Sequence, residues 1–586
     1  MDKIKQLNMK NLYIKVSIIF SLFGAIISLN GCKEELPIQG ELRLFRPEVT
    51  SSSVIANSIK VNWKQVVGAV SYTIQASQTD SFKVIDNEIT DSLFSASTTG
   101  SFSATISNLE VETNYFIRIK ANNKNSLFDS KWVVASQKTG PLASSIIIRP
   151  QSSDIGIDYV DVKWLVSNGG LTPDKISMIP LNGSVNQAVS HILTDEEKIA
   201  GKARVSGLAA STIYRIKITF GTAILGISEV KTAYALSGKV VVMNPTWKLQ
   251  NVLDTISSGS TILFTSGVVY DFSSETISIR RDITFTGEPG KPRPLLYIKD
   301  FVIGDRNVNN TRTNIGFVKL IGLELSGITY SGGIEDFSIA PKALRAFNLS
   351  IATSGLTLNL LSFENCYVRN FGYNFIHAGG NNTNSLEIGE IKVEDCIFYD
   401  LGRWQSSTAS FIFMNHDKTR KNVCNSYSIS NSTFINLQGG MITAKRNTTG
   451  GVADPNCKGI IFENCTFDKF GNKIDGYFYG STSPSFPFVQ FADERAVEER
   501  VNVPLTVKNC IFGSMPLVNV PEMTSSHNVF PTVSNSYKAS DCIFSLAGCN
   551  VWTSDAASIF GNRDLNDFTI TDSNLKKIGL GDPRWR

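Results

Sequence analysis

Basic, acidic and amide side chains recur in the second half of the chain, each time just after a short apolar segment. A base beside a cation can remove a proton next to a carboxylate, and two carboxylates at a set separation can hydrolyse a glycosidic bond. The candidate catalytic residues are His377, His416, Lys445, Arg446 and Asp493. The candidate substrate-binding residues are Asn415, Lys445, Arg446, Trp404, Tyr477 and Tyr479.

A polar edge of loops contains the same residue types without any catalysis. These positions could therefore be catalytic or could simply be polar loop residues. The three aromatic residues among them favour stacking against sugar rings in either role. The sequence contains no GxSxG, HExxH, P-loop or GxGxxG motif. We therefore expect a binding surface first and an enzyme second.

Four short segments must position these side chains, and each leads into a polar loop. The segments are FIHA, FIFM, MITA and FVQF, which begin at Phe375, Phe411, Met441 and Phe488. In a strand, alternate side chains point to opposite faces. This alternation predicts an outward row made of His377, Phe413, Thr443 and Gln490.

A motif that occurs six times organises the region around these segments. Its copies centre on a Cys or Ser: Cys366, Cys396, Ser432, Cys465, Cys510 and Cys542. A long repeat with variable spacing predicts one solenoid coil per copy. The residue before each centre is Asn or Asp, and both types tolerate left-handed backbone, so we expect a ladder at one corner of the coils. Its members are Asn365, Asp395, Asn431, Asn464, Asn509 and Asp541, and the Cys column should pack inside as small apolar fillers.

This pattern resembles the right-handed parallel β-helix of the pectate-lyase-like superfamily. Residues 246–286 look like the N-terminal cap of that superfamily, with Leu249, Leu253 and Ile256 on one helical face. The resemblance implies a substrate along one outer sheet, calcium as the cofactor to consider, and a polysaccharide lyase rather than a glycoside hydrolase if the chain is an enzyme. The GHG motif with a DD pair of polygalacturonases and the Arg-Pro-x-x-Arg segment of pectate lyases are both missing. Glu364 and Glu394 could share a calcium ion, and solvated outer residues are the alternative.

The first 31 residues are typical of a lipoprotein signal peptide. Several lysines precede an apolar run, residues 16–29, that is short for a membrane-spanning helix. The following Leu-Asn-Gly-Cys sequence resembles a bacterial lipobox, with Cys32 as the lipidated residue. The charged residues after it resemble the surface-export signals of Bacteroidota-type lipoproteins. We expect a lipid anchor in the outer membrane with display on the cell surface, and a periplasm-facing lipoprotein is the alternative.

Two segments of similar sequence precede the solenoid. Trp164 lies 101 residues after Trp63, and Tyr214 lies 99 residues after Tyr115. Each Tyr follows a Leu by six positions, a spacing that resembles the tyrosine corner of fibronectin type III modules. We expect these modules to act as a stalk, with glycan binding as the alternative.

Composition supports a folded chain of several domains. The 586 residues are 42% hydrophobic and 18% charged, with a net charge of +4. These values are typical of globular domains and do not indicate a nucleic-acid partner. The domains expected are a signal peptide (1–31), a lipidated linker (32–43), two fibronectin type III-like modules (44–140 and 141–235) and a parallel β-helix with an N-terminal cap helix (236–586).

We therefore predict an all-β chain, two fibronectin type III-like sandwiches followed by a right-handed parallel β-helix. The predicted function is a cell-surface lipoprotein that engages a complex, acidic polysaccharide along the β-helix as a monomer. A pectate-lyase-like polysaccharide lyase with an unrecorded motif and a structural adhesin or spacer stay open as alternatives.

A disulfide between Cys424 and Cys457 is also predicted. Each lies eight residues before a motif centre, so the two should occupy the same place on consecutive coils. Neighbouring strands are about 4.8 Å apart, which is within the Cα separation that a disulfide needs. An exported chain meets oxidising conditions.

Overall fold

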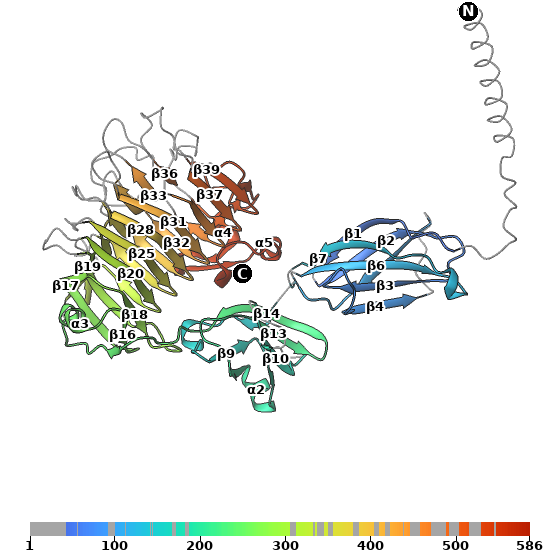
Figure 1. The fold of residues 1–586 in the computed structure, drawn as a ribbon, viewed down its shortest axis with the longest axis horizontal. Coiled ribbons are helices and arrows are strands. Elements are labelled where there is room, and N and C mark those ends of the chain that lie inside the picture. The colour runs from blue at the N-terminus through green and yellow to red at the C-terminus, as the bar shows by residue number, and fades with distance from the viewer. Residues whose placement is uncertain are drawn as a thin grey trace, which may run out of the picture. The chain divides into compact units, whose positions relative to one another are not determined.

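Figure 1 shows the computed structural model of the chain. The structure describes residues 43–55, 57–91, 100–111, 113–140, 142, 145–166, 171–181, 187–304, 312–331, 334–336, 345–349, 355–378, 386–402, 410–415, 422–437, 439–445, 457–469, 488–491, 503–514, 529–543 and 546–586. The chain forms two compact units, which divide after Gly140.

The first unit is a sandwich of two antiparallel sheets. One sheet has the order β1 (Val49–Ile55), β2 (Ser58–Lys64), β5 (Ser101–Ile106), and the other has the order β4 (Asn87–Asp91), β3 (Ser71–Ser77), β6 (Asn114–Asn122), β7 (Val133–Lys138). A short 3-10 helix, η1 (Ser126–Phe128), precedes β7. Trp63 is fully buried between the sheets, and the hydroxyl of Tyr115 accepts a hydrogen bond from the backbone N–H of Glu110 at 3.1 Å. The tyrosine corner predicted from the sequence is therefore confirmed in this unit.

A second sandwich repeats this arrangement at the start of the second unit. Its sheets are β12 (Lys202–Ser206), β9 (Tyr159–Trp164), β8 (Ile147–Ile148) and β11 (Val189–Ile192), β10 (Lys175–Pro180), β13 (Ile213–Phe220), β14 (Ala223–Lys231). The segments η2 (Ser152–Asp154) and α2 (Asp195–Ala200) connect strands. The hydroxyl of Tyr214 accepts from the backbone N–H of Ala209 at 2.9 Å. The same corner bond thus closes both sandwiches.

The rest of the second unit is a parallel β-helix, in which every coil adds strands beside those of the coil before (Figure 1). We call its three rows of strands the first, second and third rows. The first row is β15 (Val240–Val242), β16 (Ser260–Phe264), β18 (Ile283–Gly287), β20 (Thr313–Ile321), β25 (Leu356–Glu364), β28 (Leu386–Glu394), β31 (Asn422–Ser430), β34 (Gly459–Glu463), β37 (Val503–Lys508) and β39 (Val529–Ser534).

The second and third rows follow the first row on each coil. The second row is β21 (Glu324–Ser326), β26 (Tyr367–Phe371), β29 (Ile397–Leu401), β32 (Thr433–Leu437), β35 (Thr466–Asp468), β38 (Ile511–Phe512), β40 (Tyr537–Lys538) and β41 (Asn550–Val551). The third row is β24 (Phe347–Asn348), β27 (Ile376–Ala378), β30 (Ser410–Asn415), β33 (Gly440–Lys445) and β36 (Val489–Phe491). The long strands β17 (Val269–Ile279) and β19 (Leu295–Ile303) pair with each other, and β19 joins the two rows.

The remaining elements close the ends and edges of the coils. They are α3 (Leu249–Thr255), β22 (Thr329–Ser331), β23 (Ile334–Asp336), α4 (Ala556–Ile559), β42 (Phe560–Asn562), η5 (Arg563–Leu565), β43 (Asp567–Ile570), α5 (Ser573–Ile578) and η6 (Pro583–Trp585). The predicted cap helix is present as α3, and Leu249 and Leu253 are buried in the β-helix core. Apolar side chains on that face remove the open end of the coils from water.

Stacked phenylalanines fill the interior behind the second row. The rings of Phe398, Phe434, Phe467 and Phe512 follow one another with centroids 5.2, 5.2 and 4.9 Å apart and are nearly parallel. Such pairs add about 0.5 to 1.5 kcal/mol each beyond the burial of their area. The stack explains why a Phe recurs two residues after the motif centre.

The predicted corner ladder is present between the first and second rows. Its residues have left-handed backbone, from Asn365 (φ 53°) to Asn509 (φ 53°). The side-chain amide of Asn464 donates to Asn431 at 3.0 Å, and the amide of Asn509 donates to Asn464 at 3.2 Å. The Cys and Ser of the neighbouring column also do more than fill space, because each side chain hydrogen-bonds the carbonyl two residues before it: Cys366, Cys396, Ser432, Cys465, Cys510 and Ser536.

The sixth copy of the motif was placed wrongly from the sequence. Strand β39 pairs with β37, and Asn535, with φ 44°, donates to Asn509 at 2.8 Å. Asn535 and Ser536 therefore form the sixth corner, and Asp541 and Cys542 belong to the turn that follows β40. The Ser at the motif centre concealed the true copy, although Ser432 showed that Ser is accepted there.

The segment 579–586 lies along this corner and contacts several coils. The guanidinium of Arg584 donates to the backbone carbonyls of Cys396 and Asn431 at 3.1 and 2.9 Å. The indole N–H of Trp585 donates to the hydroxyl of Thr433 at 2.8 Å, and Asp582 is fully buried. We call this segment the C-terminal latch, because it joins coils that are distant in the sequence.

Candidate functional site

The third row carries the predicted outward side chains in register. His377 pairs with Phe413, Phe413 with Thr443, and Thr443 with Gln490, and Asn348 precedes them on β24. Phe413 is absent from the residues that form the apolar core, whereas its neighbour Ile412 belongs to them. We call these five positions the polar row.

The described side chains of the polar row are covered rather than solvent-exposed. Asn348, His377, Phe413 and Thr443 are each less than 10% exposed. Alternation predicted the direction of these side chains, but not the depth at which they lie. Burial of polar groups is costly unless they have hydrogen-bond partners.

His377 is held as a neutral imidazole. Its Nδ1 is 2.9 Å from Oδ1 of Asn374, and its ring stacks on Phe413 with centroids 5.1 Å apart. Burial, together with the nearby positive charge of Arg345, lowers the pKa of His377 to about 3. An imidazole with this pKa is a weak base at neutral pH, since general bases work best with a pKa near the working pH.

Arg345 lies near His377, and Asp300 lies near Arg345; neither was singled out from the sequence. Among the residues that the structure describes, Arg345 Nε and Asp300 Oδ1 are buried without a hydrogen-bond partner. The guanidinium of Arg345 lies 5.9 Å from the ring centre of Tyr373. Buried polar atoms without partners are uncommon and point to a missing ligand or water. Only the polar residues preceding β24 and β27 could have indicated this cluster in the sequence.

Most of the other predicted site residues lie outside the described part of the chain. Asn415 and Lys445 are paired in register on β30 and β33, as predicted, and their side chains are not described. The positions outside the described residues are Cys32, Trp404, His416, Arg446, Tyr477, Tyr479 and Asp493.

Glu364 and Glu394 bind an ammonium group in place of the predicted calcium ion. Lys231, at the end of β14, places Nζ 2.9 Å from Glu364 Oε1 and 3.1 Å from Glu394 Oε2. Burial opposes the charge on Lys231, but the two carboxylates outweigh it and raise its pKa. Within the described residues no cluster of three or more His, Cys, Asp or Glu could hold a metal ion. The carboxylate pair therefore joins the second sandwich to the β-helix.

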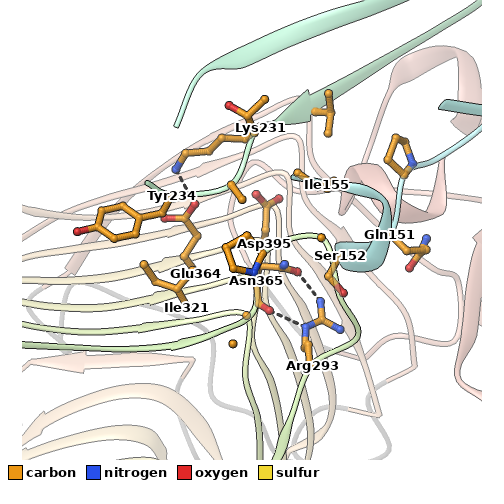
Figure 2. Close-up of a pocket in the computed structure, with 18 of the residues that line it drawn as sticks. Gln151, Ser152, Ile155, Lys231, Tyr234, Arg293, Ile321, Glu364, Asn365 and Asp395 are labelled. Carbon is orange, nitrogen blue, oxygen red and sulfur yellow. Dashed lines mark hydrogen bonds and ion pairs between the residues drawn. The ribbon is translucent and has the colours of Figure 1, made fainter. Parts of the chain in front are cut away.

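A cavity lies beside this ion pair, where the second sandwich meets the corner ladder (Figure 2). Figure 2 shows Lys231 reaching Glu364, and Arg293 reaching the backbone and side chain of Asn365. Sequence reasoning missed this cavity because its lining residues come from segments more than 200 residues apart.

Cys424 and Cys457 occupy equivalent places on consecutive coils. They precede by two residues Ser426 and Gly459, which are paired between β31 and β34. Both cysteines are buried. The register on which the disulfide prediction depends is therefore present, and the bond itself stays a prediction.

The fold defines the class of protein as all-β, with antiparallel sandwiches followed by a parallel β-helix. Among the described residues no helix is both long enough and apolar enough to cross a membrane. Residues 46–135 match the family described as Fibronectin type III domain, so the first sandwich is a domain of this family. The second sandwich lies outside the matched residues.

Comparison with solved structures finds other proteins with such domains. One is the structure of the chicken CNTN1 FN1-FN3 domains, which is 14% identical to this chain and gives a TM-score of 0.14. The alignment covers 33% of this chain and 68% of the CNTN1 chain. Another is a two-domain fibronectin type III segment of chicken tenascin, which is 17% identical to this chain and gives a TM-score of 0.15. The alignment covers 32% of this chain and 99% of the tenascin segment. No curated protein matches the chain.

Proposed function

We propose that the chain is a lipid-anchored, cell-surface protein that binds an acidic polysaccharide along the third row of its β-helix. The observation that carries this proposal is the register of the third row, which repeats one position on each of five coils and pairs the candidate binding positions Asn415 and Lys445 at the ends of β30 and β33. Since the described side chains of the polar row are buried, the polymer would contact the row at these strand ends. Four steps of about 4.8 Å extend it over about 19 Å. A linear polymer with a regular repeat suits such a row.

Arg345 supports an acidic ligand. Its buried Nε has no hydrogen-bond partner among the described residues, and the neighbouring His377 is neutral. A guanidinium binds a carboxylate with paired, charge-assisted hydrogen bonds. The unpaired Asp300 Oδ1 can accept from a sugar hydroxyl.

At His377 the geometry favours binding over lyase chemistry. A lyase needs a base that removes a proton at neutral pH, and burial lowers the pKa of His377 to about 3. The side chains of the other candidate bases, His416, Lys445 and Arg446, lie outside the described part of the chain. Glu364 and Glu394, the carboxylates suggested for calcium, are occupied by Lys231. A binding protein requires neither a base nor a metal ion at these positions.

Retention of the protein in gels that contain acidic or neutral polysaccharides tests this proposal. We expect retention by an acidic polymer, and we expect Arg345→Gln to weaken it about tenfold through the loss of charge-assisted hydrogen bonds. The control is Arg312→Gln, since Arg312 pairs with Glu387 on the first row. Equal retention of the Arg345 variant and wild type would show that the ligand binds elsewhere. Formation of an unsaturated sugar product would show that the chain is a lyase rather than a binding protein.

The anchor is tested separately by fractionation of cells. A Cys32→Ala chain should leave the membrane fraction, because it lacks the residue that carries the lipid. Cys549→Ser is the matched control, because Cys549 lies in the β-helix unit. Membrane association of the Cys32 variant equal to that of wild type would contradict lipid anchoring.

A further inference from the structure

The cavity at the junction of the second sandwich and the β-helix has a volume of about 100 Å³. A polar cavity of this size holds several water molecules or one small ion. The sandwich contributes Arg149 and the end of β14. The β-helix contributes Arg293 and the corner residues Asn365 and Asp395 (Figure 2). The latch contributes Arg584. The cavity is therefore built by three separate parts of the second unit.

One set of charges beside the cavity is balanced. Lys231 contacts Glu364 and Glu394, and Lys392 contacts Glu394 at 3.0 Å. Two ammonium groups thus meet two carboxylates. These four residues need no further ion.

The three arginines that line the cavity have fewer acidic partners. Arg584 contacts Asp582 at 2.9 Å. Arg293 donates to oxygens of Asn365, which carry no net charge. Arg149 Nη2 lies 3.9 Å from Oδ1 of Asp395, which is too long for a hydrogen bond.

Three further charged residues line the cavity: Glu229, Glu288 and Lys291. Glu229 is paired with Arg215 at 3.1 Å, and Glu288 accepts from the backbone N–H of Ser266 at 2.9 Å. Apart from the balanced pairs, four cationic groups therefore meet three carboxylates in and beside the described part of the cavity: Arg149, Lys291, Arg293 and Arg584 against Glu288, Asp395 and Asp582.

Burial opposes the charges that line the cavity. Burial lowers the pKa of both Arg149 and Arg293. The charge of Arg584 acts in the same direction on each of them, whereas Asp582 and Asp395 act in the opposite direction on Arg149. Burial also raises the pKa of Asp395 to about 6, although Arg584 and Arg149 act in the opposite direction. Buried charges of one sign are costly without a counter-ion.

We propose that this cavity binds a small oxyanion of the sulfate, phosphate or carboxylate class, with Arg149 as its main contact. The guanidinium of Arg149 offers a planar pair of donors that matches two oxygens of such an ion. The neighbouring Arg293 contributes long-range attraction while it holds the corner. Because Arg149 belongs to the sandwich and Arg293 to the β-helix, the bound ion also links the two.

Titration calorimetry on the full chain tests this site, with sulfate, phosphate and glucuronate as separate probes in chloride buffer of constant ionic strength. We expect saturable binding of one ion per chain for at least one probe, and the three probes identify the preferred class. Arg149→Gln should weaken this binding at least about tenfold, as expected when charge-assisted hydrogen bonds are lost. The matched control is Arg204→Gln, since Arg204 is exposed on β12 and pairs with Asp161 at 2.7 Å.

A second variant keeps the test decisive if Arg149→Gln does not fold. Arg149→Lys keeps the charge but loses the planar pair of donors, so it should fold and bind several-fold more weakly than wild type. The absence of saturable binding by wild type for all three probes would overturn the proposal, as would equal binding by wild type and a folded Arg149 variant. Retention on polysaccharide should be the same in all these variants, because the polar row lies on the third row.

Discussion

At the scale of residues, burial decides what the polar row can do. His377 was chosen from the sequence as a base, and its register with Phe413 was predicted correctly. Its neutral state was not predictable, because alternation gives the direction of a side chain and not its exposure. The structure buries His377 beside Arg345, and both effects favour the neutral imidazole.

The protonation state of His377 provides the first prediction. Its imidazole should keep the nitrogen NMR shifts of a neutral ring from pH 7 to pH 4.5, since its pKa is lowered to about 3. The unfolded chain binds a proton near pH 6.5 that the folded chain does not bind. The free energy of unfolding contributed by this residue should therefore be complete above pH 6.5 and fall as the pH decreases toward 3.

His377→Gln assigns the signal and serves as the control, because it removes this pH dependence. A wild-type His377 signal that titrates near pH 6.5 would contradict the burial described here. It would also restore His377 as a candidate base.

At the scale of elements, the corner ladder explains why the motif repeats. Left-handed backbone costs most residues about 1 to 2 kcal/mol, and Asn lowers this cost by local hydrogen bonding. Asn464 has φ 54°, donates to Asn431 and accepts from Asn509. Each corner thus supports the next one along the β-helix.

The second prediction compares two substitutions of Asn464. Asn464→Ala should lower the free energy of unfolding by about 2 to 3 kcal/mol, because it loses ladder hydrogen bonds and strains the left-handed backbone. Asn464→Gly loses the same bonds without that strain, so it should cost about 1 kcal/mol less. Chemical denaturation measures both values.

Asn251→Ala is the control for these substitutions, because Asn251 is exposed on α3. It should change the free energy of unfolding by less than about 0.5 kcal/mol. A Gly variant that is less stable than the Ala variant would show that backbone conformation does not dominate at this corner.

The motif predicted the first row, the corner and the Cys column, since all three depend on contacts between neighbouring coils. A second left-handed column was missed, although its residues recur four positions after the motif centre: Asn370, Asp400 and Asn436. Asn436 donates to Asp400 at 3.1 Å. The cluster of Arg345, Asp300 and His377 was beyond the motif, because Asp300 on β19 and Arg345 before β24 both precede the first copy of the repeat.

At the scale of the whole molecule, the second sandwich is part of the β-helix unit. The sequence indicated two modules of one kind and suggested a stalk for both. The structure gives the second one a specific attachment, in which Lys231 joins two successive corners of the first row. Such an attachment depends on residues about 130 to 160 positions apart, which no local pattern indicates.

The third prediction removes this attachment. Lys231→Ala leaves two partly buried carboxylates without their main cation, so the free energy of unfolding should fall by about 1 to 3 kcal/mol. Limited proteolysis should then cut between β14 and β15 faster than in wild type. Lys202→Ala, an exposed position on β12, is the control and should leave the cleavage rate unchanged.

An unchanged cleavage rate in a folded Lys231 variant would mean that other contacts fix the sandwich. Contacts in the oxyanion cavity, where Arg149 approaches Asp395, would then hold the sandwich in place.

The C-terminal latch has a consequence for the order of folding. Coils can form one after another, because each coil needs only the coil before it. Arg584 and Trp585, in contrast, contact residues that precede them by 188 and 152 positions. Contacts of such long range close late, since much chain entropy must be lost first. During synthesis the corner carbonyls of the early coils therefore stay exposed to solvent until the C-terminal latch has been made and has docked. The chain reaches its full resistance to unfolding only after that step.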